Sequence, residues 1–181
     1  MNLNERTLVI TRIARENPKI GKTAMMKCLY LLQTIEKVPL DYSFRIYTYG
    51  PYSSLAMDEI DYASQNGYIV ISGMNYQVGF GYSITCSAAG EKFLDNSSAL
   101  EPYAAMITCI IETFAAKTAK ELELLSTIVY IVCMYNQNHW DMSENEICKS
   151  VQEIKPHFTL EDIELEYRFL DDNNYLLKAV Q

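Results

Sequence analysis

The chain has 181 residues, of which nearly half are hydrophobic and few are glycine or proline, and its net charge is −8. This composition can fill a sizeable core and excludes extended disorder, and the length allows one domain or two small ones. The charge is uneven, because residues 1–50 carry +4 and residues 51–181 carry −12. Any polyanion would therefore favour the first fifty residues and be repelled by the rest.

The first fifty residues predict two helices and a strand. Asn4 can cap a helix over about residues 5–16, and Asn17-Pro18 ends it because a residue before proline disfavours the helical conformation. Lys22–Glu36 has apolar residues at helical spacing and predicts the second helix. Phe44–Tyr49 alternates and is rich in aromatic residues, which indicates a strand.

A third helix is expected after a turn at Gly50-Pro51, over about residues 53–66. Ser53 or Ser54 can cap it, and Asn66-Gly67 ends it because glycine accepts the left-handed conformation at a helix C-terminus. The order of strand, tight turn and capped helix, with a new strand to follow, is that of the back half of a winged helix.

A hairpin follows, with strands Tyr68–Ser72 and Gly81–Thr85 joined by residues 73–80 as a flexible and fairly apolar tip. A short helix opens at Ser87, and Asp95–Ser98 has the composition of a linker. The whole order is that of a winged helix, a fold built mainly for binding, and it places a winged-helix domain at residues 1–96.

Residues 97–181 predict a helical C-terminal domain packed on the first. The expected helices are Pro102–Ala116, Ala119–Tyr135, Ser143 to about Ile154, and one that Thr159 caps. The chain end, Phe169–Leu177, repeats the order of residues 62–70, with a helix, an Asn-bearing stop and an aromatic-led strand. A second helix-turn-helix is kept open on this ground, and the fold class expected overall is α+β, mainly α.

The sequence shows no organised catalytic or cofactor site. Its two histidines, His139 and His157, have no Cys, Ser or carboxylate at a catalytic spacing. Gly21-Lys22-Thr23 matches the tail of a phosphate-binding loop, but Glu16 stands where that loop needs glycine, so a helix start is expected. The five cysteines are widely spaced without a C-x-x-C pair, which favours buried, reduced thiols: Cys28, Cys86, Cys109, Cys133 and Cys148. We predict no enzyme, cofactor or metal.

Membrane insertion and secretion are not expected either. The start, Met1–Arg6, lacks the apolar run of a signal peptide. The longest apolar region, Leu124–Tyr135, is interrupted by Ser126 and Thr127 and is too short to span a bilayer. We expect a cytoplasmic protein.

The helix over residues 53–66 would enter the major groove in a DNA-binding winged helix. It contains Asp58, Glu59 and Asp61 and no lysine or arginine, which argues against that docking because affinity for DNA comes mostly from neutralised phosphates. The basic residues that could form a patch elsewhere include Arg12, Arg15, Lys19 and Lys22.

Three tyrosines surround the Gly-Pro turn. Strand alternation places Tyr47 and Tyr49 on one face with Arg45, where they could stack on single-stranded bases together with Tyr52. Packing of these rings against the following helix is the favoured interpretation.

Five short segments of the chain form a recognisable set: Lys27-Cys28-Leu29-Tyr30-Leu31-Leu32, Tyr47-x-Tyr49-Gly50-Pro51-Tyr52-Ser53, Asn66-Gly67-Tyr68-Ile69, Glu121–Thr127 and Ile154–Phe158. Together they resemble the YwgA-like group of bacterial winged-helix proteins, which is distantly similar to the SocA-like, or Panacea, antitoxin domain. The resemblance implies a winged helix without known activity, cofactor or catalytic residues, and the Panacea comparison implies toxin neutralisation through protein contacts.

We therefore predict a non-enzymatic winged-helix protein that binds a protein partner, as an antitoxin-like or regulatory module whose partner is a toxin or defence component. The expected binding surface is the hairpin tip, with Met74, Tyr76, Val78 and Phe80. The alternative is a DNA-binding transcriptional regulator that uses the basic N-terminal patch and the wing. A homodimer is also expected, because helices 102–116 and 119–135 offer more apolar surface than a small helical half readily buries.

Overall fold

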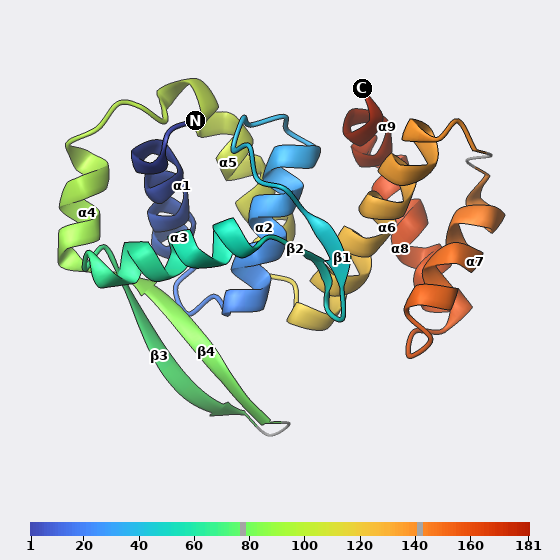
Figure 1. The fold of residues 1–181 in the computed structure, drawn as a ribbon, viewed down its shortest axis with the longest axis horizontal. Coiled ribbons are helices and arrows are strands. Elements are labelled where there is room, and N and C mark those ends of the chain that lie inside the picture. Colours follow the sequence, from blue (N-terminus) through green and yellow to red (C-terminus); the bar gives the residue numbers. More distant parts are fainter. Residues whose placement is uncertain (77–78, 141–142) are drawn as a thin grey trace.

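The computed structural model of the chain describes residues 1–76, 79–140 and 143–181. Helices predominate and two separate antiparallel hairpins complete the fold, which agrees with the expected α+β, mainly α class (Figure 1). No helix within these ranges is long and apolar enough to cross a membrane. The elements in chain order are α1 Leu3–Glu16, α2 Lys22–Thr34, β1 Arg45–Tyr47, β2 Gly50–Tyr52, α3 Ser54–Gln65, β3 Ile69–Tyr76, β4 Gly79–Cys86, α4 Ala88–Asp95, the 3₁₀ turn η1 Glu101–Tyr103, α5 Ala104–Ile110, the π-helical turn η2 Ile111–Ala115, α6 Ala119–Gln137, α7 Glu144–Ile154, α8 Leu160–Asp172 and α9 Tyr175–Val180.

Helix α1 begins earlier than expected, because Asn2 rather than Asn4 caps it. The Asn2 side chain accepts a hydrogen bond from the Glu5 N–H at 3.0 Å, and the Glu5 carboxylate accepts one from the Asn2 N–H at 2.7 Å. This reciprocal pair satisfies donors at a helix start that have no partner within the helix. Three other expected caps are confirmed, with Ser53 opening α3, Ser87 opening α4 and Thr159 opening α8.

The first hairpin, β1–β2, turns earlier than predicted. Its strands pair Tyr47 with Gly50 and Ile46 with Pro51, so the turn is Thr48-Tyr49, and Gly50-Pro51 begins the second strand. Proline is tolerated at position 51 because residue pairs in an antiparallel ladder alternate between hydrogen-bonded and non-hydrogen-bonded pairs. Tyr47 and Gly50 form the hydrogen-bonded pair that closes the turn, so the next pair, Ile46 with Pro51, requires no N–H from the proline.

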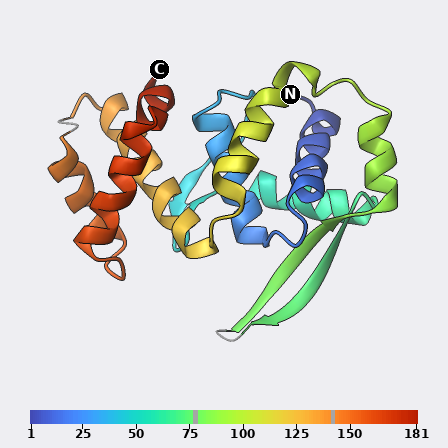
Figure 2. The ribbon, with the colours of Figure 1, turned by 180° about the vertical axis from the view of Figure 1, so that it is seen from behind.

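The second hairpin, β3–β4, is longer than predicted, and we call it the arm. Its ladder runs from Ile69↔Cys86 to Tyr76↔Gly79, so most of the expected loop over residues 73–80 is strand. Glycines within the arm stand opposite larger residues in the ladder, as in Gly73↔Tyr82 and Met74↔Gly81. The arm projects from the helical body (Figures 1 and 2).

The chain ends in a helix, which corrects the strand expected from the echo of the first half. Asn174 adopts the left-handed conformation at φ 60°, and α9 begins at the next residue. Leu176 and Ala179, one helical turn apart, are the buried residues of α9. They pack where α9 contacts α6 and α8, and this packing decides the conformation.

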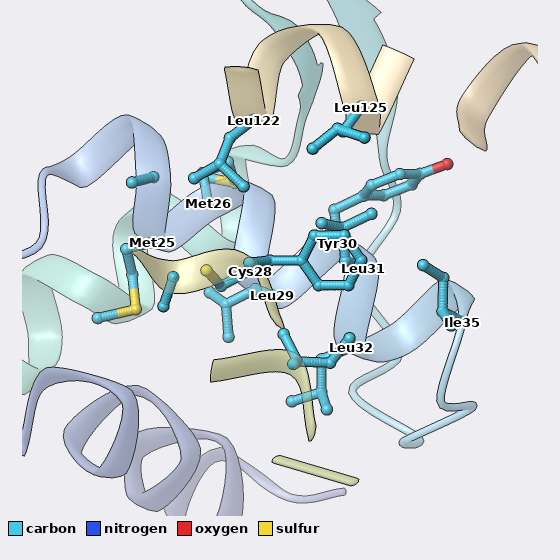
Figure 3. Packing of buried hydrophobic residues seen from close by; sticks show 14 of the residues in the cluster. Met25, Met26, Cys28, Leu29, Tyr30, Leu31, Leu32, Ile35, Leu122 and Leu125 are labelled. Atoms are coloured by element: carbon cyan, nitrogen blue, oxygen red, sulfur yellow. The ribbon is translucent and has the colours of Figure 1, made fainter. Parts of the chain in front are cut away.

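Both halves of the chain contribute to one hydrophobic cluster. Leu29 and Leu32 of α2 are fully buried in it, as are Leu122 and Leu125 of α6, which lie near Met26 and Tyr30 (Figure 3). The apolar faces of α5 and α6 are therefore covered within the single chain, and the surface from which a homodimer was expected is not exposed. The homodimer and the domain boundary after residue 96 stay predictions.

Gly90 offers a test of how tightly α4 packs against the rest of the first half. A Cβ at this position would lie 2.1 Å from the Tyr68 carbonyl oxygen and 2.8 Å from Cys86 Sγ. We expect Gly90→Ala to lower the free energy of unfolding by about 1–3 kcal/mol or more, measured by urea denaturation. Ala88→Ser adds one atom at an exposed site of the same helix and should change stability by less than about 0.5 kcal/mol. Equal stability of the two variants would contradict this packing.

Candidate functional site

The β1–β2 hairpin packs closely on α6, and Gly50 makes that approach feasible. Gly50 has φ 87°, and a Cβ there would lie 3.2 Å from both Ser126 Oγ and Thr127 Oγ1. These hydroxyls donate to the carbonyl of Glu123, at 3.2 Å from Ser126 and 2.7 Å from Thr127. Only glycine suits this position, since it combines a left-handed backbone with contact against a helix.

Two buried lysines from distant parts of the chain bind backbone carbonyls of the hairpin. Lys155, from the turn between α7 and α8, donates to the carbonyls of Tyr47 and Thr48, and Lys27 of α2 donates to the Pro51 carbonyl at 2.6 Å. Both lysines are only 2% exposed. The hairpin is thus fixed by segments more than a hundred residues apart in the chain.

One buried carboxylate, that of Glu123, accompanies the two buried lysines and offsets part of their charge. Glu123 Oε1 lies 2.7 Å from Lys155 Nζ and 3.4 Å from Nε2 of the exposed His157. Burial lowers the pKa of Lys27 to about 8; Glu123 opposes that shift and Lys155 adds to it. We call Lys27, Glu123 and Lys155 the lysine clamp. Its two ammonium groups require the hairpin carbonyls as acceptors, because buried charge is costly without them.

The clamp presents three tyrosines to solvent. Tyr47 and Tyr49 are 70% and 66% exposed, and the rings of Tyr47 and Tyr52 lie 5.9 Å apart. The expectation that these rings pack against the following helix is wrong for Tyr47 and Tyr49, which are mostly exposed. The two-residue turn at Thr48-Tyr49 leaves them at the surface, and the side chains that α3 buries are Ala56, Glu59, Ile60 and Ala63.

A cavity of about 220 Å³ lies beside the tyrosines. Its walls come from α2, the hairpin and α3, and include Met26, Lys27, Tyr47, Tyr49, Tyr52 and Met57. We call this cavity and the exposed tyrosines the tyrosine face. The sequence placed the three rings near one another, but it gave no signal that the buried Lys27 and Lys155 meet behind them.

The basic residues proposed for nucleic acid form no open patch. Arg12 donates to Glu16 at 2.7 Å and to Thr108 Oγ1 at 3.0 Å. Arg15 lies 3.6 Å from both Glu91 and Asp95, and Lys22 lies 2.5 Å from Asp61. Lys19 is exposed and has a left-handed backbone. Three of the four predicted side chains are thus held by carboxylates, which already neutralise them.

The acidic character of α3 is also smaller than the sequence suggested. Glu59 is buried, where it accepts hydrogen bonds from Arg6 at 2.5–3.1 Å and from the Tyr42 hydroxyl at 2.6 Å. This carboxylate raises the pKa of Arg6, and burial raises that of Tyr42. Asp61 pairs with Lys22, so Asp58 remains as the exposed acid of the helix.

The surface expected at the tip of the arm is described in part. Met74 is 41% exposed, and Tyr76 and Phe80 lie within β3 and β4. Val78 lies outside the described residues. The binding role of these residues stays a prediction.

The thiols and histidines form no reactive group in the part of the chain that the structure describes. All five cysteines are free, and burial raises their pKa, to about 12 for Cys28 and about 11 for Cys133. Thiols of this kind are poor nucleophiles near neutral pH. No three metal-ligating side chains meet among the described residues. At Gly21-Lys22-Thr23 the expected helix start is confirmed, with Gly21 at the N-cap of α2.

Comparison of the chain with protein-family models and with curated proteins gives no match.

Lys27 makes the stability of the chain depend on pH. Its pKa is about 8 when folded and near the ordinary 10.5 when unfolded, so between these values the unfolded chain binds more protons and stability rises with pH. We expect the unfolding free energy of the wild type minus that of Lys27→Met to increase from about pH 7.5 to about pH 9.5 in urea titrations. Lys92→Met, at an exposed lysine, should show no such trend. A constant difference for Lys27→Met would contradict the depressed pKa.

Proposed function

We propose that the chain is a non-enzymatic winged-helix protein of the cytoplasm that acts by binding another protein, in an antitoxin-like or regulatory role. The observation that carries this proposal is the tyrosine face, which two buried lysines hold in place. The winged-helix assignment is supported by the order of α1, α2, α3 and the arm, and by contacts of α1 with α3 and of α2 with β4.

Exposed aromatic residues on a rigid support favour a protein partner. Tyrosine is enriched at protein interfaces because it buries a large area while fixing only two side-chain torsions. The lysine clamp holds the backbone of Tyr47 and Thr48 before any partner arrives. Binding then costs less conformational entropy, which is a general advantage of a preformed surface.

The size of the cavity in the tyrosine face favours the same class of partner. Small-molecule sites usually enclose about 300–1,000 Å³, whereas this cavity encloses about 220 Å³. Met26 and Met57 give it an adaptable apolar lining. We propose that it receives a single apolar side chain that anchors the partner.

The tyrosines can be tested with the partner that they capture. Purified wild type and Tyr47→Ser/Tyr49→Ser would be used as bait in an extract of the native host, and each specifically captured protein would then be purified and titrated. We expect the double variant to weaken the affinity about tenfold or more, because two anchors are lost. Tyr62→Ser, at an exposed tyrosine near the C-terminal end of α3, should bind as the wild type does. Equal affinity of all three proteins would overturn the role of this face.

DNA binding remains the alternative, and exposed Lys19 is the basic residue that favours it. The protein-binding proposal predicts that the wild type flows through a heparin column at about 0.1 M salt, since most of the basic patch is internally paired. Retention that is lost in Lys19→Glu, together with a shift of duplex DNA, would instead support the regulator. Binding to single-stranded DNA that is lost in Tyr47→Ser would indicate base stacking on the tyrosine face.

A further inference from the structure

The arm differs from the rest of the chain in its charge. No lysine, arginine, aspartate, glutamate or histidine stands between Asp61 and Glu91, although the chain as a whole carries −8. This interval contains all of β3 and β4. The arm is thus the part of the molecule where two copies could approach each other without bringing like charges into contact.

The outer part of the arm stands clear of the body. Its base is anchored by Ile69 and Ile84, which are buried, whereas Ser72 and Asn75 are exposed and Met74 is 41% exposed. The two ribbon views, from opposite sides, both show the far end projecting away from the helices (Figures 1 and 2). A two-stranded hairpin has little stability alone in water, so the projecting part of the arm would be stabilised by contact with another surface.

The two edges of the arm differ in the backbone hydrogen bonds that they make to the rest of the chain. On β4, the Ile84 N–H donates to the Ile20 carbonyl at 2.8 Å, and the Ile84 carbonyl accepts from the Lys19 N–H at 2.9 Å. Both backbone groups of Ile84 therefore point away from β3, which makes Ile71↔Ile84 a non-hydrogen-bonded pair of the ladder. The alternation of the ladder then points the backbone groups of Ile71, Gly73 and Asn75 outward from β3.

These outward groups form an open edge. In the part of the chain that the structure describes, no other strand pairs with β3 on that side. Proteins usually protect such an edge with lysine, proline or a covering segment, because it can pair with another strand. The edge from Ile71 to Asn75 has no charged residue and no proline.

We infer that two copies of this chain pair through the outer edges of their β3 strands, antiparallel about a two-fold axis near Gly73. In that register Ile71 stands opposite Asn75 of the second copy, and the outward N–H and C=O groups of both strands meet as hydrogen-bonded pairs. Gly73 at the axis has no side chain to hinder the approach. We assign the edge to a second copy because it is self-complementary and neutral. A different protein would be expected to bring positive charge that complements the net charge of −8, and it would therefore favour a charged surface over this edge.

Proline at an outward position tests the backbone pairing. Asn75→Pro removes an N–H that points away from β4, so the arm keeps its own ladder and loses two bonds of the dimer. Sedimentation equilibrium should show a dimer for the wild type and a dissociation constant raised about tenfold or more for Asn75→Pro. Asn75→Thr retains the N–H and should dimerise as the wild type does.

A pair of isosteric variants gives an independent test that does not disturb the backbone. Met74→Glu places a negative charge on each copy near the axis and should weaken the dimer in low salt, with partial recovery at about 0.5 M salt. Met74→Gln has the same shape without charge and should leave the dissociation constant unchanged. A monomeric wild type at every concentration, or a dimer that Asn75→Pro and Met74→Glu leave intact, would overturn the inference.

Discussion

The position of the β1–β2 hairpin depends on the lysine clamp. Two ammonium groups and one carboxylate lie buried together, so the surplus donors must find neutral acceptors or pay a large desolvation cost. Those acceptors are the backbone carbonyls of Tyr47, Thr48 and Pro51. Clamp and hairpin require each other, because strands of three residues are too short to stay folded alone. The tyrosine face exists because this dependence fixes the backbone that carries it.

The clamp also connects segments that look unrelated in the sequence. Lys27, Gly50-Pro51, Glu123 and Lys155 come from four short segments spread along the chain, and each alone is too short to carry a function. In space they are mutual partners, since both lysines donate to carbonyls of the hairpin and Glu123 pairs with Lys155. The simplest physical account of these four segments is one structural unit that presents a surface.

The sequence could predict structure where the signal is local. Ser53 and Ser87 cap the helices expected of them, and Asn66-Gly67 ends α3, because caps depend on neighbouring backbone groups. It failed where distant contacts decide, as at the end of the chain, where packing on α6 and α8 makes a helix of α9. The candidate site was hidden for the same reason. Lysine is normally a surface residue, so nothing local marks Lys27 and Lys155 as buried.

The count of charges along the sequence disfavoured DNA binding because the third helix is acidic, but the structure shows that this reason is incomplete. Two of the three acids of that helix are paired with basic residues of the N-terminal segment, Glu59 with Arg6 and Asp61 with Lys22. Arg12 and Arg15 are paired with acids outside α3. What disfavours polyanions is the absence of free basic groups on α3 and the arm. The surfaces that remain are aromatic on the hairpin and neutral on the arm. Because the two surfaces lie on separate hairpins, binding of a partner and pairing of copies can be altered independently by mutation.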